Sequence, residues 1–242
     1  MIRILVKEFN AFLDSLIAYI VIGAFLTSMG LLMWVFPETS VLHYGFADMD
    51  TLFSLAPYVF MFLIPAITMR SFAEEKRAGT LELLFTRPVT DWEIVLGKFF
   101  AGFMLVLFAL LPTGIYYLSV YWLGDPPGNL DSSGVAGSYI GLSLLGAVFC
   151  ALGILASSFS TNQIVSFIIA AFLCFILFSG FDSLAALNLW SRNVLLIKQL
   201  GILYHYESMG RGVIDTRDVL YFVSLTAILL LATKTIISAR TW

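Results

Sequence analysis

The stretch from Ser132 to Phe181 runs for 50 residues without a charged side chain. As a single helix it would be about 75 Å long, whereas the hydrocarbon core of a bilayer is about 30 Å thick. The stretch must therefore fold back on itself. The polar run Ser157–Gln163 is the expected hairpin, with helices over about 138–157 and 163–181. Composition agrees with a membrane protein, because 60% of the 242 residues are hydrophobic and only 12% are charged.

Other uncharged runs have the length that a membrane-spanning helix needs. They predict further spans over about 15–36, 51–69, 99–123 and 219–237. Residues 1–14 place apolar side chains at helical spacing, which predicts a helix lying in the membrane interface. The expected fold is therefore an all-α integral membrane protein with six transmembrane helices and an N-terminal interfacial helix. We expect residues 1–242 to form one transmembrane domain.

The distribution of basic residues predicts the orientation. Six spans place both termini on the same side as the loop 70–98, and these segments hold nine Lys and Arg residues: Arg3, Lys7, Arg70, Lys76, Arg77, Arg87, Lys98, Lys234 and Arg240. The loops on the other side hold four, all within 182–218: Arg192, Lys198, Arg211 and Arg217. Because basic residues favour the cytoplasmic side, both termini are expected in the cytoplasm and 182–218 outside.

The loop 70–98 is the one densely charged segment between two predicted spans. It holds five basic and five acidic residues, so it is expected to stand in water. Gly79 predicts the end of a first short helix, and Thr80 predicts the start of a second. Arg87-Pro88 ends that second piece. The run Thr90–Glu93 has the pattern of a capping box, which predicts a third helix starting at Asp91 and entering the membrane.

The residues argue against several kinds of chemistry. The chain has no phosphate-binding G-x-x-x-x-G-K-[ST] motif and no ionisable side chain in the middle of a span, which disfavours an ATPase and a proton-driven carrier. Glu74-Glu75 resembles the paired glutamates of intramembrane proteases, but those place Arg where this chain has Gly79. Cys150 and Cys174 lie in apolar runs and are expected to be buried thiols. No enzyme activity, cofactor, metal or nucleic-acid partner is expected.

Two segments together identify a family resemblance. Residues 70–84, RSFAEEKRAGTLELL, followed by TRPV at 86–89, closely resemble the cytoplasmic loop between spans two and three of ABC-2 type permeases. The run from His205 through Arg211–Asp215 to Tyr221-Phe222 resembles the segment entering the last helix of that family. Length and detail look most like the gliding-motility-associated permease subunit. The resemblance covers the whole chain and implies the ABC-2 permease fold.

The resemblance implies an exporter in the bacterial inner membrane. A separate ABC ATPase subunit, which binds the ATP, would dock on the loop 70–98 and pass its movement to the spans. Two permease chains, identical or different, would form the pathway within membrane lipid, and a gliding system would add an accessory subunit. The implied docking residues are Glu74, Glu75, Lys76, Arg77, Gly79, Leu81, Glu82, Leu84, Phe85, Arg87 and Pro88.

For the outer loop the resemblance implies short re-entrant helices near the exit of the pathway. The residues expected to fix that loop onto the last span are His205, Arg211, Gly212, Asp215, Arg217 and Asp218. Two other functions stay open at this point. The chain could be a membrane anchor that recruits a cytoplasmic partner without transporting anything, or a membrane-embedded hydrolase that depends on Glu74 or Glu75. The residues do not specify a substrate.

Overall fold

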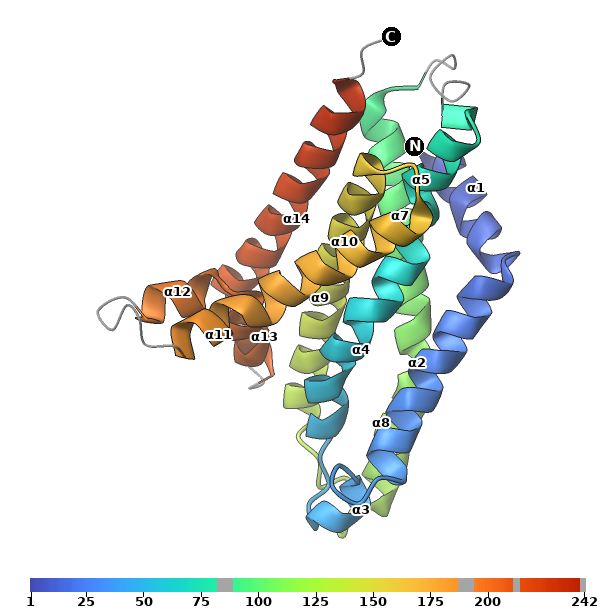
Figure 1. The fold of residues 1–242 in the computed structure, drawn as a ribbon. Helices are drawn as coiled ribbons and strands as arrows, with labels where there is room; N and C mark the ends of the chain where they lie inside the picture. Colours follow the sequence, from blue (N-terminus) through green and yellow to red (C-terminus); the bar gives the residue numbers. More distant parts are fainter. Residues whose placement is uncertain (82–88, 187–193, 211–213, 240–242) are drawn as a thin grey trace.

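The computed structural model describes residues 1–81, 89–186, 194–210 and 214–239, and these parts of the chain are helices joined by short turns (Figure 1). Six of the helices are long and apolar enough to cross a membrane, as predicted. They run over Leu16–Trp34, Asp50–Arg77, Asp91–Leu123, Ser132–Phe159, Gln163–Ala186 and Thr216–Ser238.

Several of these spans are built from shorter elements. The first half of the chain contains α1 (Ile2–Leu13), α2 (Leu16–Trp34), α3 (Val41–Tyr44), α4 (Asp50–Thr68), α5 (Arg70–Arg77) and α7 (Asp91–Leu110). The second half contains the 3-10 turn η1 (Leu111–Thr113), α8 (Gly114–Leu123), α9 (Ser132–Phe159), α10 (Gln163–Phe175), the π-helical turn η2 (Ile176–Gly180), α11 (Phe181–Ala186), α12 (Val194–Leu200), α13 (Ile202–Met209) and α14 (Thr216–Ser238).

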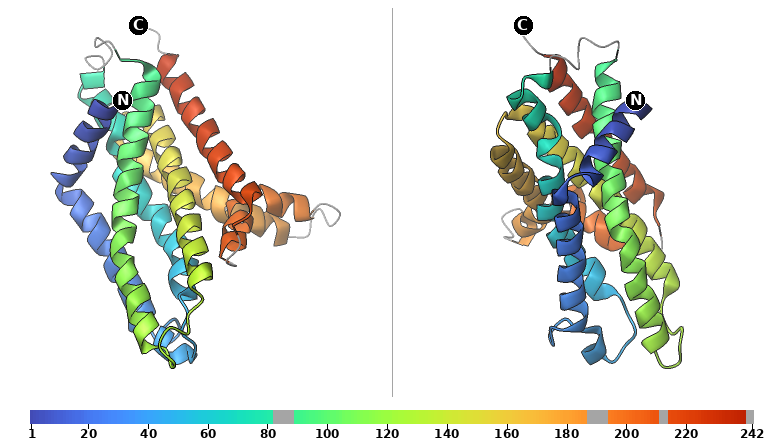
Figure 2. Two further views of the ribbon diagram at one scale, coloured as in Figure 1. Left: turned by 180° about the vertical axis from the view of Figure 1, so that it is seen from behind. Right: turned by 90° about the vertical axis from the view of Figure 1, so that its right-hand side faces the viewer.

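The start of α1, helix α5 and the end of α14 lie together at one end of the molecule (Figure 1). The turn that carries α3 and the end of α8 form the opposite end. Helices α11, α12 and α13 project sideways between the two ends, at a large angle to α14 (Figures 1 and 2). The last predicted loop therefore contains short helices, which is the arrangement that the family resemblance implies.

Helix α9 is the centre of the packing, since α4, α7, α10, α13 and α14 all contact it. Its side chains are buried almost continuously from Leu145 to Ser158. Gly146 and Gly153 let two neighbouring helices approach closely. A Cβ atom on Gly146 would lie 2.9 Å from a Val106 methyl of α7, and one on Gly153 would overlap the side chain of Thr68 in α4. The small residues of this span therefore mark helix contacts.

The hairpin after α9 is shorter than predicted, because α9 ends two residues later than expected while α10 starts at Gln163, as predicted. Helix α9 continues to Phe159, and the turn consists of Ser160 to Asn162. The Asn162 side chain accepts the backbone N–H of Ile164 at 2.9 Å and so caps α10. Ser157, predicted in the turn, is instead fully buried inside the helix. The sequence pattern placed Ser157 in the turn because serine is a polar residue. In the structure its hydroxyl is hydrogen bonded to backbone groups inside the protein, so it can be buried.

The entry to span three agrees with prediction. Thr90 is the N-cap residue of α7 and receives the backbone N–H of Glu93 at 3.3 Å, while the Glu93 carboxylate accepts the backbone N–H of Thr90 at 3.1 Å. This reciprocal pair is a capping box, and the helix begins at Asp91. Helix α7 is followed by the 3-10 turn η1, which contains Pro112. Helix α8 then continues toward the opposite end of the molecule.

Candidate functional site

Helix α5, which carries the charged motif, is separated from α4 by a break at Met69. Ser157 of α9 bridges this break. Its hydroxyl oxygen accepts the backbone N–H groups of Phe72 at 2.8 Å and Ala73 at 3.0 Å, and its hydroxyl donates to the carbonyl of Met69 at 3.2 Å. One side chain from another helix therefore satisfies the first turn of α5, which no side chain of its own caps. The direction of α5 depends on α9.

A buried lysine ties α5 to two further helices. The Lys98 ammonium, on α7, lies 2.9 Å from a Glu75 carboxylate oxygen of α5 and 3.2 Å from a Glu8 carboxylate oxygen of α1. It also donates to the Ser71 carbonyl at 2.6 Å and lies 5.1 Å from the centroid of the Phe72 ring. Three acceptors match the three hydrogens of an ammonium group. Only 1% of the Lys98 side chain is exposed, so the charge is held by these partners.

The amphipathic helix α1 packs along the start of α7. A Cβ atom on Gly97 would come within 2.8 Å of the Ile4 side chain, so the missing side chain allows the two helices to touch. The terminal ammonium of Met1 lies 3.0 Å from the Glu93 carboxylate. The Lys7 ammonium lies 3.9 Å from the Glu75 carboxylate. Helices α1, α5, α7 and α9 therefore form one connected unit at this end.

The structure divides the predicted docking residues by the side of α5 on which they lie. Glu74, Arg77 and Gly79 are exposed, and Gly79 has the left-handed backbone (φ +68°) expected at the end of a helix. Glu75 and Lys76 face the protein instead, Glu75 toward Lys98 and Lys76 toward the Ser158 carbonyl of α9.

The remaining predicted docking residues follow Gly79. Leu81 is 6% exposed, so in this structure its side chain is part of the core. Five of the predicted residues lie outside the described part of the chain: Glu82, Leu84, Phe85, Arg87 and Pro88.

The prediction that the whole loop 70–98 stands in water is wrong for Lys98. The argument from charge assumed that a cation at the end of a charged loop is solvated. Here α1 covers the start of α7 and supplies a carboxylate, so the cation is buried with its partners rather than with water. Sequence reasoning also missed Glu8 and Ser157. No local signal marks either residue, because each acts on a segment more than 80 residues away.

In the predicted outer loop, His205 of α13 contacts both α12 and α14. Its Nδ1 is 2.7 Å from the buried Asp218 carboxylate of α14, its Nε2 is 2.9 Å from the Gln199 carbonyl, and its ring stacks on Tyr221 at 4.0 Å. Asp215 caps α14 by accepting the backbone N–H of Arg217, whose side chain is exposed. Arg211 and Gly212 lie outside the described residues.

Metal-binding clusters and exposed thiols are both absent from the described ranges. No cluster of three or more His, Cys, Asp or Glu residues there could hold a metal ion. Cys150 and Cys174 are buried free thiols, as expected. At α5, one exposed face is backed by contacts to α1, α7 and α9.

Comparison with known proteins agrees with this architecture. A family model described as ABC-2 family transporter protein matches residues 37–197, which is two thirds of the chain. The match includes α5, the capping box and the central helix α9. Comparison with curated proteins gave no match. With six apolar helices and a family match over most of its length, the chain is a multi-pass membrane protein that belongs to the ABC-2 family of transporter permeases.

Proposed function

We propose that this chain is the membrane-spanning permease of an ATP-driven exporter and that the separate ATPase subunit docks on the exposed face of α5. The observation that carries the proposal is the two-sided character of α5. Glu74 and Arg77, three residues apart on one helix face, are exposed, while Glu75 and Lys76 are held by the protein. Such a helix offers charged groups to a partner and transmits force through its other side.

The contacts of α5 give the route by which a partner's movement would reach the spans. A push on α5 acts on α9 through Ser157 and on α7 and α1 through Lys98. Helix α7 continues from this point as span three without a break until η1. Rigid, buried contacts of this kind transmit displacement because a packed interior deforms little.

Reversing the charge on the exposed face should weaken the ATPase complex. We expect Arg77→Glu and Glu74→Arg each to reduce binding of the ATPase subunit by about tenfold or more, the effect typical of a central interface residue. The chain itself should remain folded, since neither side chain is buried. The measurement is co-purification of the ATPase with the detergent-extracted permease, identified by mass spectrometry and quantified against the unaltered chain.

Arg3→Glu provides the matched control, because Arg3 is an exposed cation of α1 at the same end of the molecule. Equal loss in Arg3→Glu and Arg77→Glu would show a general charge effect and contradict docking on α5. The alternative function, a membrane scaffold, predicts the same co-purification. It differs in that reconstitution with the permease would leave the ATPase rate unchanged, whereas an exporter's ATPase responds to its permease.

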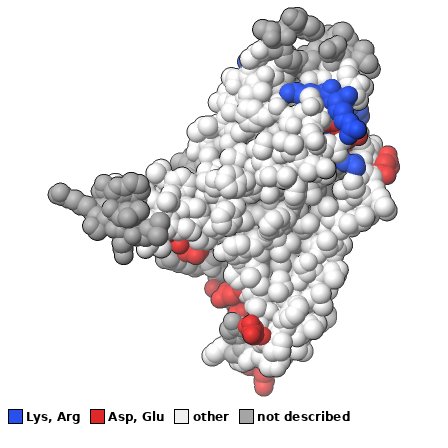
Figure 3. Space-filling model, in the orientation of Figure 1, with Lys and Arg blue, Asp and Glu red and all other residues white. Residues whose placement is uncertain are grey.

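The orientation that we propose places α5 and both termini in the cytoplasm of a bacterium, in its inner membrane. It is supported by the nine basic residues of that side against four, and by the grouping of Lys and Arg near the α5 end (Figure 3). Single cysteines placed at Arg77 and Glu38, in a chain with Cys150 and Cys174 changed to Ala, test it. Labelling of residue 77, and not 38, by an impermeant thiol reagent applied to whole cells would contradict it.

The narrower proposal, a gliding-motility exporter with an accessory subunit and a second permease chain, rests on the motif resemblance alone. It predicts that deleting the gene stops cells from spreading over a surface and that re-expression restores spreading. Spreading that is unaffected by the deletion would remove the gliding assignment and leave the exporter proposal standing.

A further inference from the structure

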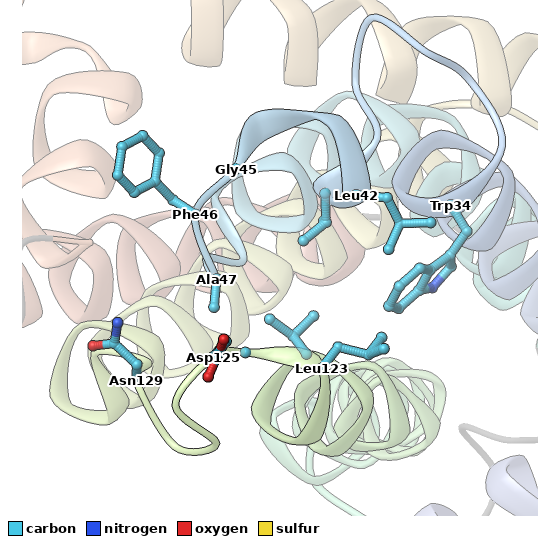
Figure 4. A pocket seen from close by; sticks show the side chains of 11 residues that line it. Trp34, Leu42, Gly45, Phe46, Ala47, Leu123, Asp125 and Asn129 are labelled. Atoms are coloured by element: carbon cyan, nitrogen blue, oxygen red, sulfur yellow. The ribbon is translucent and has the colours of Figure 1, made fainter.

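We propose that the end of the molecule opposite α5 holds a binding site for an amphiphile whose headgroup is a positively charged amine. A cavity of about 470 Å³ lies there between the turn after α2 and the end of α8 (Figure 4). Its volume is within the range of about 300–1,000 Å³ found for small-molecule sites. The site lies far from α5, and the proposal does not depend on an ATPase.

Most of the side chains that line the cavity are apolar, although polar atoms make up nearly half of its exposed lining. The buried Val41 and Val120 line it together with the half-buried Trp34 and with Leu42 and Leu123 (Figure 4). Leu42 and Leu123 are each more than half exposed, so the cavity is open with an apolar rim. Such a surface favours an alkyl segment over a purely polar ligand.

The position of the cavity indicates which part of a membrane it meets. Helix α2 ends at Trp34 and α8 ends at Leu123, so the cavity lies where two spans leave the bilayer. Phe36 and Trp122 are exposed close to these two helix ends, and aromatic side chains are enriched at membrane interfaces. A ligand at this level has its chain in the hydrocarbon and its headgroup near water.

The charges at this end select the sign of the headgroup. The two segments that close it, 35–50 and 124–131, hold no Lys or Arg but five carboxylates: Glu38, Asp48, Asp50, Asp125 and Asp131. Asp125 lines the cavity together with the Asn129 amide (Figure 4). The Trp34 ring offers a second attraction for a cation. Apolar side chains, an indole ring and a carboxylate together fit an amine-bearing amphiphile and disfavour an anionic one.

Binding is measured by quenching of Trp34, which lines the cavity. In a chain whose other tryptophans (Trp92, Trp122, Trp190 and Trp242) are changed to Phe, the purified protein in maltoside micelles is titrated with two amphiphiles. Both carry the same brominated alkyl chain, one with a trimethylammonium and the other with a sulfate headgroup. We expect half-quenching at an about two- to fivefold lower concentration of the ammonium compound, the factor expected for one exposed charge contact.

Two variants test the role of the carboxylate. Asp125→Asn should abolish the difference between the two headgroups, and Asn129→Asp, which adds a carboxylate to the same lining, should increase it. Asp131→Asn is the matched control. Hydrogen bonds from the Ser133 hydroxyl and the Gly134 backbone lower the pKa of Asp131, so the control removes a full charge from the same end but outside the cavity. Asn also keeps the cap of α9.

The proposal is overturned if both headgroups quench equally in the unaltered cavity, or if Asp125→Asn behaves like Asp131→Asn. A competition then distinguishes the two sources of the same headgroup chemistry. If unbrominated phosphatidylethanolamine displaces the ammonium compound, the site holds a membrane lipid. If it does not, while soluble amine amphiphiles do, the site holds an amphiphile that is not a bilayer lipid.

Discussion

Lys98→Met should lower the stability of the protein more than any other single charge removal in the described segments. The substitution keeps most of the unbranched side chain but leaves Glu8, Glu75 and the Ser71 carbonyl without their shared donor. Breaking a buried ion pair by removing one partner costs about 3–5 kcal/mol. For a chain of this size we expect a melting temperature lower by roughly 10 °C, measured on purified protein in one fixed detergent.

Lys7→Met is the matched control for this experiment. Lys7 approaches the same two carboxylates at 3.6 and 3.9 Å, but 64% of its side chain is exposed. Its removal should cost less than about 1 kcal/mol. The double variant Glu75→Gln with Lys98→Met should lose less than the sum of its single changes, because the partners are removed together. Equal melting temperatures for Lys98→Met and Lys7→Met would show that the buried cluster does not hold the helices together.

Gly153→Ala should disrupt the contact between α4 and α9. A Cβ atom at residue 153 would overlap the Thr68 hydroxyl and lie 2.8 Å from the Thr68 Cβ, and both residues are buried. The Thr68 hydroxyl already donates to the Ile64 carbonyl at 2.8 Å and has little freedom to move. Overpacking of this kind costs about 1–3 kcal/mol. We expect a clear fall in melting temperature and in the yield of monodisperse protein.

Gly23→Ala controls for the change of residue type. Gly23 lies in α2, and a Cβ atom there meets nothing within 4 Å. Since Ala favours a helix over Gly by roughly 1 kcal/mol, this variant should be neutral or slightly stabilised. Adding Thr68→Ala to Gly153→Ala removes the hydroxyl overlap and should restore part of the loss. A Gly153→Ala protein as stable as Gly23→Ala would contradict the close helix contact.

The features that could be predicted from the sequence are those whose cause is local. The start of α7 follows from the capping box, which is complete within Thr90–Glu93. The end of α5 follows from Gly79, and the existence of the spans follows from uncharged length. The sideways helices α11–α13 could be expected only through the family resemblance, since their segment has mixed composition.

The features that could not be predicted depend on residues distant in the sequence. Glu74 and Glu75 are adjacent glutamates in the same charged segment, so the sequence gives no reason to separate them. In the structure Glu75 is bound to Lys98, whereas Glu74 is exposed. The distinction comes from Lys98 of α7, which binds Glu75, and from α1, which packs against α7 and supplies Glu8. Charge counting establishes that a segment needs polar partners, and it does not establish whether those partners are water or another helix.

The bridge at Ser157 has a consequence for how the protein is made. Residues 70–77 leave the ribosome about 80 residues before Ser157, and N-terminal parts of a chain fold first during synthesis. The first turn of α5 nevertheless takes its final hydrogen bonds from Ser157. Helix α5 therefore reaches its final position only after α9 has been inserted into the membrane. A truncated or unfinished chain that lacks α9 would also lack these hydrogen bonds, so under the proposed function it would not present α5 correctly to the ATPase.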